Sequence, residues 1–187
     1  IRYIRENTEA IIVTAQAMES LKPGRGMGHL LPEALYEAGA RATFLNHAEN
    51  PMTMAELSKT IARARELGIE TIACADSLAE GTAIAAFRPD ILLCEPTDLI
   101  GTGKTADDSY TTSIVAKIRS IDPTIGIMIA SGITTADDVY RVVRLGADGS
   151  GATSGILSAP DPAQRILEMA EAIMRAAAER EAQNSAA

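Results

Sequence analysis

Residues 91–105 read ILLCEPTDLIGTGKT, which is a strand-length apolar run followed by a loop with unusual chemistry. The apolar run ends at Cys94 and is followed by a carboxylate, Glu95, and by Pro96. The loop then carries glycines at 101 and 103. A carboxylate at the carboxyl end of a strand, beside a loop hinged between proline and glycine, is typical of a general base under a lid. The alternative is an ordinary strand-to-helix connection with a solvated glutamate.

The rest of the chain repeats this order of strand and helix. Apolar runs predict strands at 11–16, 41–46, 70–75, 90–94, 125–130 and 147–152. Helical spacing predicts helices at 29–37, 54–67, 78–87, 109–121, 135–145 and 162–178, with a frayed tail at 179–187. Strict alternation requires parallel strands with right-handed crossovers. We therefore predict an α/β protein with a single domain over residues 1–187.

Two architectures satisfy this alternation, a (β/α) barrel and an open doubly wound sheet. Several predicted helices end in a tight turn capped by glycine, whereas the loops after the strands are longer and richer in polar residues. This asymmetry is typical of a barrel, whose active site lies on the loops after its strands. A doubly wound sheet would carry G-x-G-x-x-G after its first strand, and that pattern is absent. The barrel is favoured, although six units are two short of eight.

Composition restricts the possible partners. The formal net charge is −8 and the pI is near 4.8, which argues against nucleic acid and against anionic membranes. No apolar run is long enough to span a bilayer. The two cysteines, Cys74 and Cys94, lie at the ends of apolar strand-like runs and are predicted to be buried, reduced thiols of a cytoplasmic protein. The acidic pairs at helix starts do not converge, so no metal site is predicted.

A second candidate for acid–base chemistry follows another predicted strand. His47 and Glu49 lie in the segment NHAEN, just past the run TFLN. A histidine in such a position is frequently structural. With Glu95 at a nearby strand end, however, the two side chains could enolise a carbonyl substrate. The carboxylate would remove a proton next to the carbonyl, and a neutral imidazole would stabilise the charge that develops on oxygen.

The last two predicted strands are followed by small residues. Ser131 and Gly132 come after the run IGIMIA, and Thr153, Ser154 and Gly155 come after the final strand. Small residues at a helix start let backbone N–H groups approach an anion. The phosphate sites of barrels are frequently found after the last two strands. Ordinary tight turns are the alternative, but two such segments in adjacent positions favour a phosphate site.

These segments together resemble the triosephosphate isomerase family, in particular its shorter, archaeal-type branch. The resemblance is carried, in the family's order, by AQAMESLKPGRGMGHLLPEALYEAGA, LNHAE, EPTDLIGTGKT, IASGITTADDV and LGADGSGATSGI. It implies a TIM (β/α)8 barrel of which this chain provides strands three to eight. It also implies interconversion of dihydroxyacetone phosphate and D-glyceraldehyde 3-phosphate through an enediolate, with no cofactor or metal, in a cytoplasmic homo-oligomer, a dimer or a tetramer.

The resemblance also assigns roles to individual residues. It implies that Glu95 is the general base, a role assignment for which this family is a standard example, and that neutral His47 is the electrophile. Glu49 matches an acidic residue that supports the site. Residues Pro96 to Thr105 resemble the family's lid. The implied phosphate-binding residues are Ile100, Gly101, Gly132, Thr153 and Ser154.

The chain also departs from the family pattern. Ala48 and Asn50 replace a serine and an arginine, which opens the alternative of an isomerase for a larger phosphorylated keto sugar. The first strand, first helix and second strand have no counterpart, and the start at Ile1 leads us to expect a clipped sequence. The family's first-strand lysine is therefore missing. Loss of that charge is expected to cost on the order of several kcal/mol of transition-state stabilisation, which leaves the activity of the chain as given open.

Two further alternatives remain. The segment IASGITTADDVYRVVRLGADG, residues 129–149, also resembles the phosphate-binding end of barrel synthases such as the indole-glycerol-phosphate and thiamine-phosphate synthases. Those enzymes would not need His47. The other alternative is an inactive, truncated chain that serves only as a binding or assembly unit.

Overall fold

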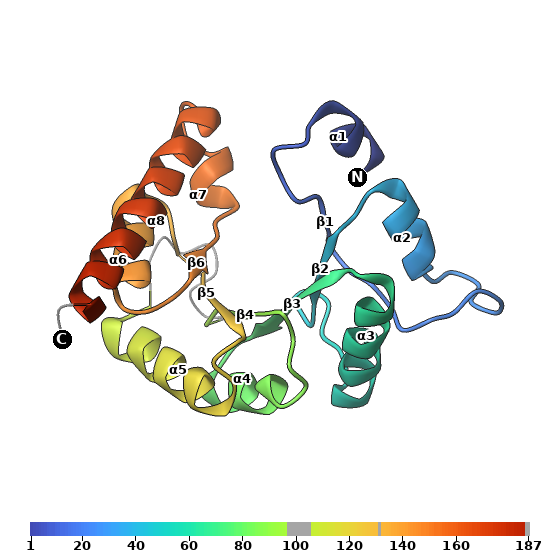
Figure 1. Ribbon diagram of the computed structural model, residues 1–187. Helices are drawn as coiled ribbons and strands as arrows, with labels where there is room; N and C mark the ends of the chain where they lie inside the picture. Colours follow the sequence, from blue (N-terminus) through green and yellow to red (C-terminus); the bar gives the residue numbers. More distant parts are fainter. Residues whose placement is uncertain (97–105, 131, 186–187) are drawn as a thin grey trace.

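The computed structural model describes residues 1–96, 106–130 and 132–185, and its centre is a parallel sheet. The strands are β1 (Thr14–Ala15), β2 (Ala42–Leu45), β3 (Glu70–Ala75), β4 (Ile91–Cys94), β5 (Gly126–Ile129) and β6 (Gly149–Ser150). They pair in chain order from β1 to β6, all parallel. The sheet curls into a half-barrel with helices on its outer side (Figure 1). A doubly wound sheet would reverse its strand order, so the barrel-type prediction is confirmed at this level.

Eight helices are found in the described residues. They are α1 (Arg2–Asn7), α2 (Pro32–Ala38), α3 (Met54–Leu67), α4 (Leu78–Ala85), α5 (Asp108–Ile121), α6 (Ala136–Arg144), α7 (Ser154–Leu157) and α8 (Pro162–Ser185). Gly39 and Gly68 end α2 and α3 in the left-handed conformation, with φ of 108° and 69°. This conformation suits glycine because it lacks a Cβ atom. The predicted glycine caps are confirmed at these two positions.

The two faces of the sheet carry different sets of apolar side chains, because successive residues of a strand point to opposite faces. The outer set packs against the helices and includes Leu92, Cys94 and Ile127. The inner set includes Ile72, Cys74 and Leu93. The two cysteines therefore lie on neighbouring strands but in different clusters. Both are buried free thiols, as predicted.

The chain termini and sheet edges differ most from the predicted elements. The edge strands β1 and β6 have two residues each, where six were predicted. Each edge strand pairs on one side only within the described residues, so fewer backbone groups are held in ladder geometry. The eight-stranded closure, the missing first elements and the single domain stay predictions.

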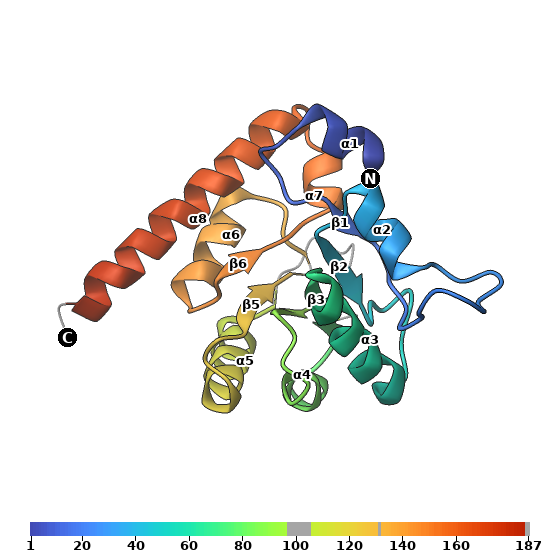
Figure 2. The same ribbon diagram turned by 45° about the vertical axis from the view of Figure 1, so that its right-hand side comes forward.

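The last helix extends beyond its predicted end at residue 178, into the tail that was predicted to fray. Helix α8 continues to Ser185 and packs along α6 (Figure 2). Arg180 donates hydrogen bonds to the carbonyl oxygens of Val143 and Ala147, at 3.1 and 2.7 Å. The carboxylate of Glu179 accepts a hydrogen bond from Tyr140. These contacts fasten α8 to α6 and to Ala147 just past the predicted end of the helix.

Candidate active site

The predicted acid–base residues meet at the carboxyl ends of β2 and β4. Leu45, the last residue of β2, is in register with Ala73 of β3, and Ala75 is in register with Cys94 of β4. His47 and Glu95 follow these strand ends on the same edge of the sheet. The Nε2 atom of His47 lies 3.8 Å from the Oε2 atom of Glu95. The structure thus brings together two side chains that are 48 positions apart in the sequence.

The backbone after β2 determines which nitrogen of His47 carries hydrogen. The N–H of Glu49 donates a hydrogen bond to Nδ1 of His47, at 3.2 Å. A backbone N–H can only donate, so Nδ1 is an acceptor and the neutral ring carries its hydrogen on Nε2. The N–H of Asn50 also donates to the carbonyl oxygen of His47, at 2.8 Å, which closes the turn. The donor Nε2–H therefore faces Glu95.

Glu95 lies in surroundings that suit a base. Its side chain is 17% exposed, and its backbone N–H donates to the carbonyl oxygen of Ala75 at 2.8 Å. Burial raises the pKa of Glu95 above the usual range of a glutamate; His47 opposes this shift and Glu49 adds to it. A carboxylate with a raised pKa is a stronger base than a solvated one. The alternative of a merely solvated glutamate does not fit this burial.

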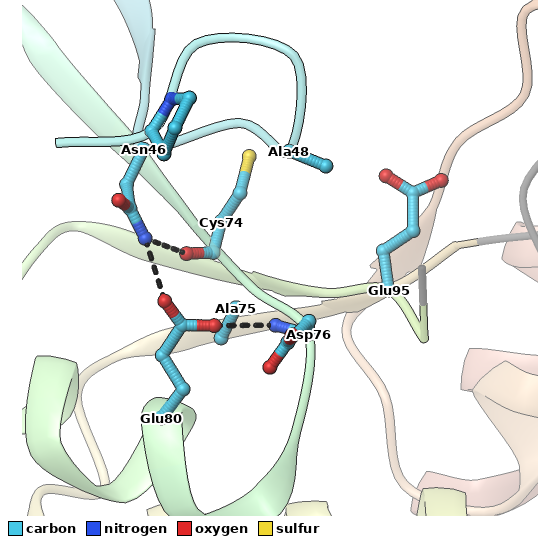
Figure 3. Close-up of a pocket in the computed structure, with 8 residues that line it drawn as sticks. Asn46, Ala48, Cys74, Ala75, Asp76, Glu80 and Glu95 are labelled. Carbon is cyan, nitrogen blue, oxygen red and sulfur yellow. Dashed lines mark hydrogen bonds between the residues drawn. The ribbon is translucent and has the colours of Figure 1, made fainter. Parts of the chain in front are cut away.

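A pocket of about 220 Å³ lies beside Glu95. It is lined by Asn46, Ala48, Pro51, Cys74, Ala75, Asp76, Glu80 and Glu95. Figure 3 shows Asn46, Glu80 and Asp76 joined by hydrogen bonds. Glu95 and Ala48 lie at a distance from this group. Burial, with the nearby carboxylates of Glu95 and Glu80, raises the pKa of Cys74 to about 12. The raised pKa favours the protonated thiol of Cys74 over the thiolate, which is the nucleophilic form of cysteine.

The loops that follow β5 and β6 meet each other. A Cβ atom on Gly155 would lie 2.8 Å from the Cα atom of Thr134 and closer still to the carbonyl oxygen of Ile133. Gly132 has φ of +69°, and Thr153 and Ser154 are exposed at the start of α7. The loops predicted to bind phosphate are thus adjacent. Ile100 and Gly101, together with the rest of the predicted lid from residue 97 to 105, lie outside the described residues.

The sequence reasoning missed Asn46, Asp76 and Glu80. Asn46 was read only as the end of a strand, although it directly precedes His47. Glu80 follows the N-cap Ser77 by three residues, and this spacing signals a helix start with a carboxylate free to reach back along the chain. That local signal does not say which strand the carboxylate reaches.

Two other features of the described residues bear on partners. None of the helices in residues 1–96, 106–130 and 132–185 combines the length and the apolar character needed to cross a membrane. In the same ranges, no group of three or more histidine, cysteine, aspartate or glutamate side chains could hold a metal ion.

The fold and this geometry define a class, an α/β protein of the barrel type with a carboxylate–imidazole pair at the carboxyl ends of its strands. The sequence model of the family described as triosephosphate isomerase matches residues 1–173. The chain belongs to the triosephosphate isomerase family, and the resemblance seen in its motifs is confirmed.

Individual relatives agree with this assignment. A triosephosphate isomerase of Methanoculleus marisnigri is 37% identical over 156 residues, which cover 82% of this chain and 70% of the relative. One of Sulfurisphaera tokodaii is 35% identical over 160 residues, covering 84% and 69%. One of Methanocaldococcus jannaschii is 33% identical over 172 residues, covering 90% and 78%.

Proposed function

We propose that this chain interconverts dihydroxyacetone phosphate and D-glyceraldehyde 3-phosphate through an enediolate. The carboxylate of Glu95 removes a proton from the carbon next to the carbonyl and later returns it to the neighbouring carbon. The Nε2–H of neutral His47 donates to the substrate oxygens as negative charge develops on them. Family membership supports the substrate, and the pair at 3.8 Å supports the roles.

One observation carries the proposal, the hydrogen bond from the N–H of Glu49 to Nδ1 of His47. It occupies the nitrogen that faces away from Glu95, so the nitrogen that faces the carboxylate is the donor. A histidine with the opposite tautomer would present a lone pair to the developing oxyanion and would repel it. Glu49 therefore supports the site through its backbone N–H. Its exposed carboxylate is not needed for this hydrogen bond.

We further propose that the substrate phosphate binds where the loops after β5 and β6 meet. Gly132, Thr153 and Ser154 would supply backbone N–H groups, and Ile100 and Gly101 would close over the anion. The close approach of Gly155 to Ile133 and Thr134 supports a shared site, since a side chain there would separate the loops. In this scheme the proton transfers use only side chains of the chain, without a cofactor or metal.

The test combines turnover with ligand binding. We expect the chain to isomerise dihydroxyacetone phosphate and the variant His47→Gln to lose most of that activity. We also expect phosphoglycolate, an enediolate mimic, to raise the Tm. Full isomerase activity of His47→Gln would refute the role of His47 as the electrophile. Absence of both turnover and a Tm shift would favour the inactive chain. Binding without turnover would refute the proposed isomerisation by this chain.

A larger phosphorylated keto sugar is the second candidate substrate. Ala48 lines the pocket beside Glu95 at the position where the family pattern has a serine, which leaves more room there. Comparison of kcat/KM for triose and tetrose phosphates separates the two. A higher kcat/KM for the tetrose phosphate would replace the triose as the proposed substrate.

We also propose a cytoplasmic homo-oligomer, a dimer or a tetramer. The two buried free cysteines support a reducing compartment. Apolar side chains exposed near the sheet edges support assembly; they include Ile11 and Ile12 before β1 and Leu157 in α7. Light scattering of the purified chain tests this, and a monomer at all concentrations would refute it.

A further inference from the structure

Glu80 joins two strand-end loops of the candidate site. It is the third residue of α4, whose N-cap Ser77 accepts a hydrogen bond from the N–H of Glu80 at 3.2 Å. Its carboxylate accepts one hydrogen bond from the N–H of Asp76, at 2.7 Å, and one from Nδ2 of Asn46, at 2.9 Å (Figure 3). The carboxylate thus ties the start of the loop after β2 to the loop after β3.

Asn46 in turn holds the segment that carries His47. Its backbone is in the left-handed region, with φ of 57°, a conformation that asparagine tolerates better than most residues. Its Oδ1 accepts a hydrogen bond from the N–H of Met52, at 2.9 Å, and its Nδ2 donates to the carbonyl oxygen of Cys74, at 3.0 Å. The Asn46 side chain therefore clamps both ends of the loop from residue 46 to residue 52.

The carboxylate of Glu80 helps to set the orientation of the Asn46 amide. In the observed orientation, Nδ2 faces two acceptors, the Glu80 carboxylate and the Cys74 carbonyl. A reversed amide would place Oδ1 against both acceptors and would present NH₂ to the N–H of Met52. The bond to Glu80 involves a charged acceptor, and such bonds are stronger than those between neutral groups.

We infer that Glu80 is a positioning residue for the acid–base pair, acting through Asn46. With the amide fixed, the loop ends are held together and the N–H of Glu49 stays on Nδ1 of His47. This hydrogen bond keeps Nε2–H directed at Glu95. The expected effect on catalysis rests on the proposed function. The expected effect on the His47 ring rests on the hydrogen bonds alone.

The chain offers a matched control. Glu56 is also the third residue of its helix, α3, with the N-cap Thr53 accepting from its N–H. Its carboxylate also accepts hydrogen bonds from another segment, from the N–H and hydroxyl of Ser20. Those bonds do not involve Asn46 or His47. Glu56→Ala therefore removes a comparable helix-start carboxylate without releasing the His47 loop.

The first readout is the ring nitrogens of histidine in ¹⁵N NMR, which distinguish the two tautomers. The chain has only two histidines, and His29 serves as the internal reference. In the parent chain and in Glu56→Ala we expect His47 to carry hydrogen on Nε2. In Glu80→Ala we expect signals intermediate between the two tautomers. An unchanged His47 spectrum in Glu80→Ala would overturn the inference. This comparison needs no turnover, so it stands apart from failure of the proposed function.

The second readout is kinetic. We expect Glu80→Ala to lower kcat roughly 10- to 100-fold with little change in KM, because a misplaced catalytic group affects the transition state most. Glu80→Gln, which keeps an acceptor for Asn46, should recover part of kcat. Asn46→Ala should lower kcat similarly, and combining it with Glu80→Ala should add little. An equal fall in Glu56→Ala, or additive effects, would refute the positioning role. If Glu80→Ala does not fold, Asn46→Ala is compared in its place, and parental kcat and spectra in that variant would then refute the positioning role.

Discussion

The Nε2 atom of His47 lies 3.8 Å from the Oε2 atom of Glu95, although β3 separates the strands that these residues follow. The curl of the sheet turns the two strand ends toward a common interior, so residues on β2 and β4 can approach each other past the intervening strand. At this distance the two groups do not form a hydrogen bond. Both therefore remain available to a substrate, one as an acceptor of protons and one as a donor.

Replacement of the base is expected to abolish most of the activity. Glu95→Gln keeps the size of the side chain but cannot accept the proton, so kcat should fall by roughly 10²- to 10⁴-fold with a small change in KM. The control is Glu70→Gln, at the opposite end of β3, where the side chain is exposed. A coupled spectrophotometric assay checks both. Retention of parental kcat in Glu95→Gln would show that another group removes the proton.

The raised pKa of Glu95 predicts the pH dependence of the reaction. Catalysis needs the carboxylate, so the acidic limb of kcat/KM should lie above the usual pKa of a glutamate. Glu49 adds to the upward shift in the pKa of Glu95. Glu49→Gln should therefore move the acidic limb to lower pH. Rate profiles of both proteins across the acidic range test this, and a shift to higher pH would contradict it.

The same shift has a consequence for stability. The folded chain holds the Glu95 proton more tightly than the unfolded chain does, because the folded pKa is raised. The contribution of Glu95 to stability is therefore present below the usual glutamate pKa and is lost as pH rises through the folded pKa. Glu95→Gln should gain stability relative to the parent across that window. Denaturant unfolding at a series of pH values measures this, and a constant difference would contradict it.

The contact between the loops after β5 and β6 predicts a severe effect of a single methyl group. Gly155→Ala places a Cβ atom against Ile133 and Thr134, and should lower the free energy of unfolding by about 1–3 kcal/mol and weaken phosphoglycolate binding. Gly151→Ala is the control, because its Cβ atom would lie 3.7 Å from Met128, an ordinary contact. Calorimetric titration and unfolding compare them. Equal affinities would place the phosphate elsewhere.

A buried hydroxyl group predicts a stabilising substitution. The hydroxyl of Tyr110 in α5 is buried and has no hydrogen-bond partner among the described residues. Its burial, with nearby acidic groups, raises the pKa of Tyr110, so the group stays protonated. Tyr110→Phe should raise the free energy of unfolding by about 1 kcal/mol. Tyr3→Phe is the control, since Tyr3 is 78% exposed. Loss of stability in Tyr110→Phe would show that the hydroxyl has a partner.

Elements with strong local signals were predicted closely. Helix α3 and strand β3 have the predicted bounds, 54–67 and 70–75. Thr53 caps α3, Gly68 ends it, and the following apolar run is too short for a helix. Signals of this kind act within a few residues. The edge strands and the end of α8 were predicted poorly, because their extent depends on pairing and on contacts such as that of Arg180 with Val143.

The candidate site likewise contains residues that local signals predict and residues that only tertiary contacts reveal. Glu95, His47 and the small residues after β5 and β6 were found from their positions after apolar runs and from a family resemblance. Glu80 and Asn46 were not found, because 34 positions separate them and their hydrogen bond exists only when β3 lies beside β2. The sequence likewise did not predict which ring nitrogen of His47 carries the hydrogen, because that depends on the hydrogen bond from the N–H of Glu49.

For this protein, local chain chemistry was sufficient to place most helices and central strands, to indicate its family and to select its candidate acid–base residues. Apolar periodicity, caps and strand-end polar residues are short-range properties that each segment carries alone. The meeting of His47 with Glu95, the clamp of Glu80 on Asn46 and the contact of Gly155 with Thr134 depend on strand order and register. Those relationships are set by how the whole sheet curls and packs, which no single segment encodes.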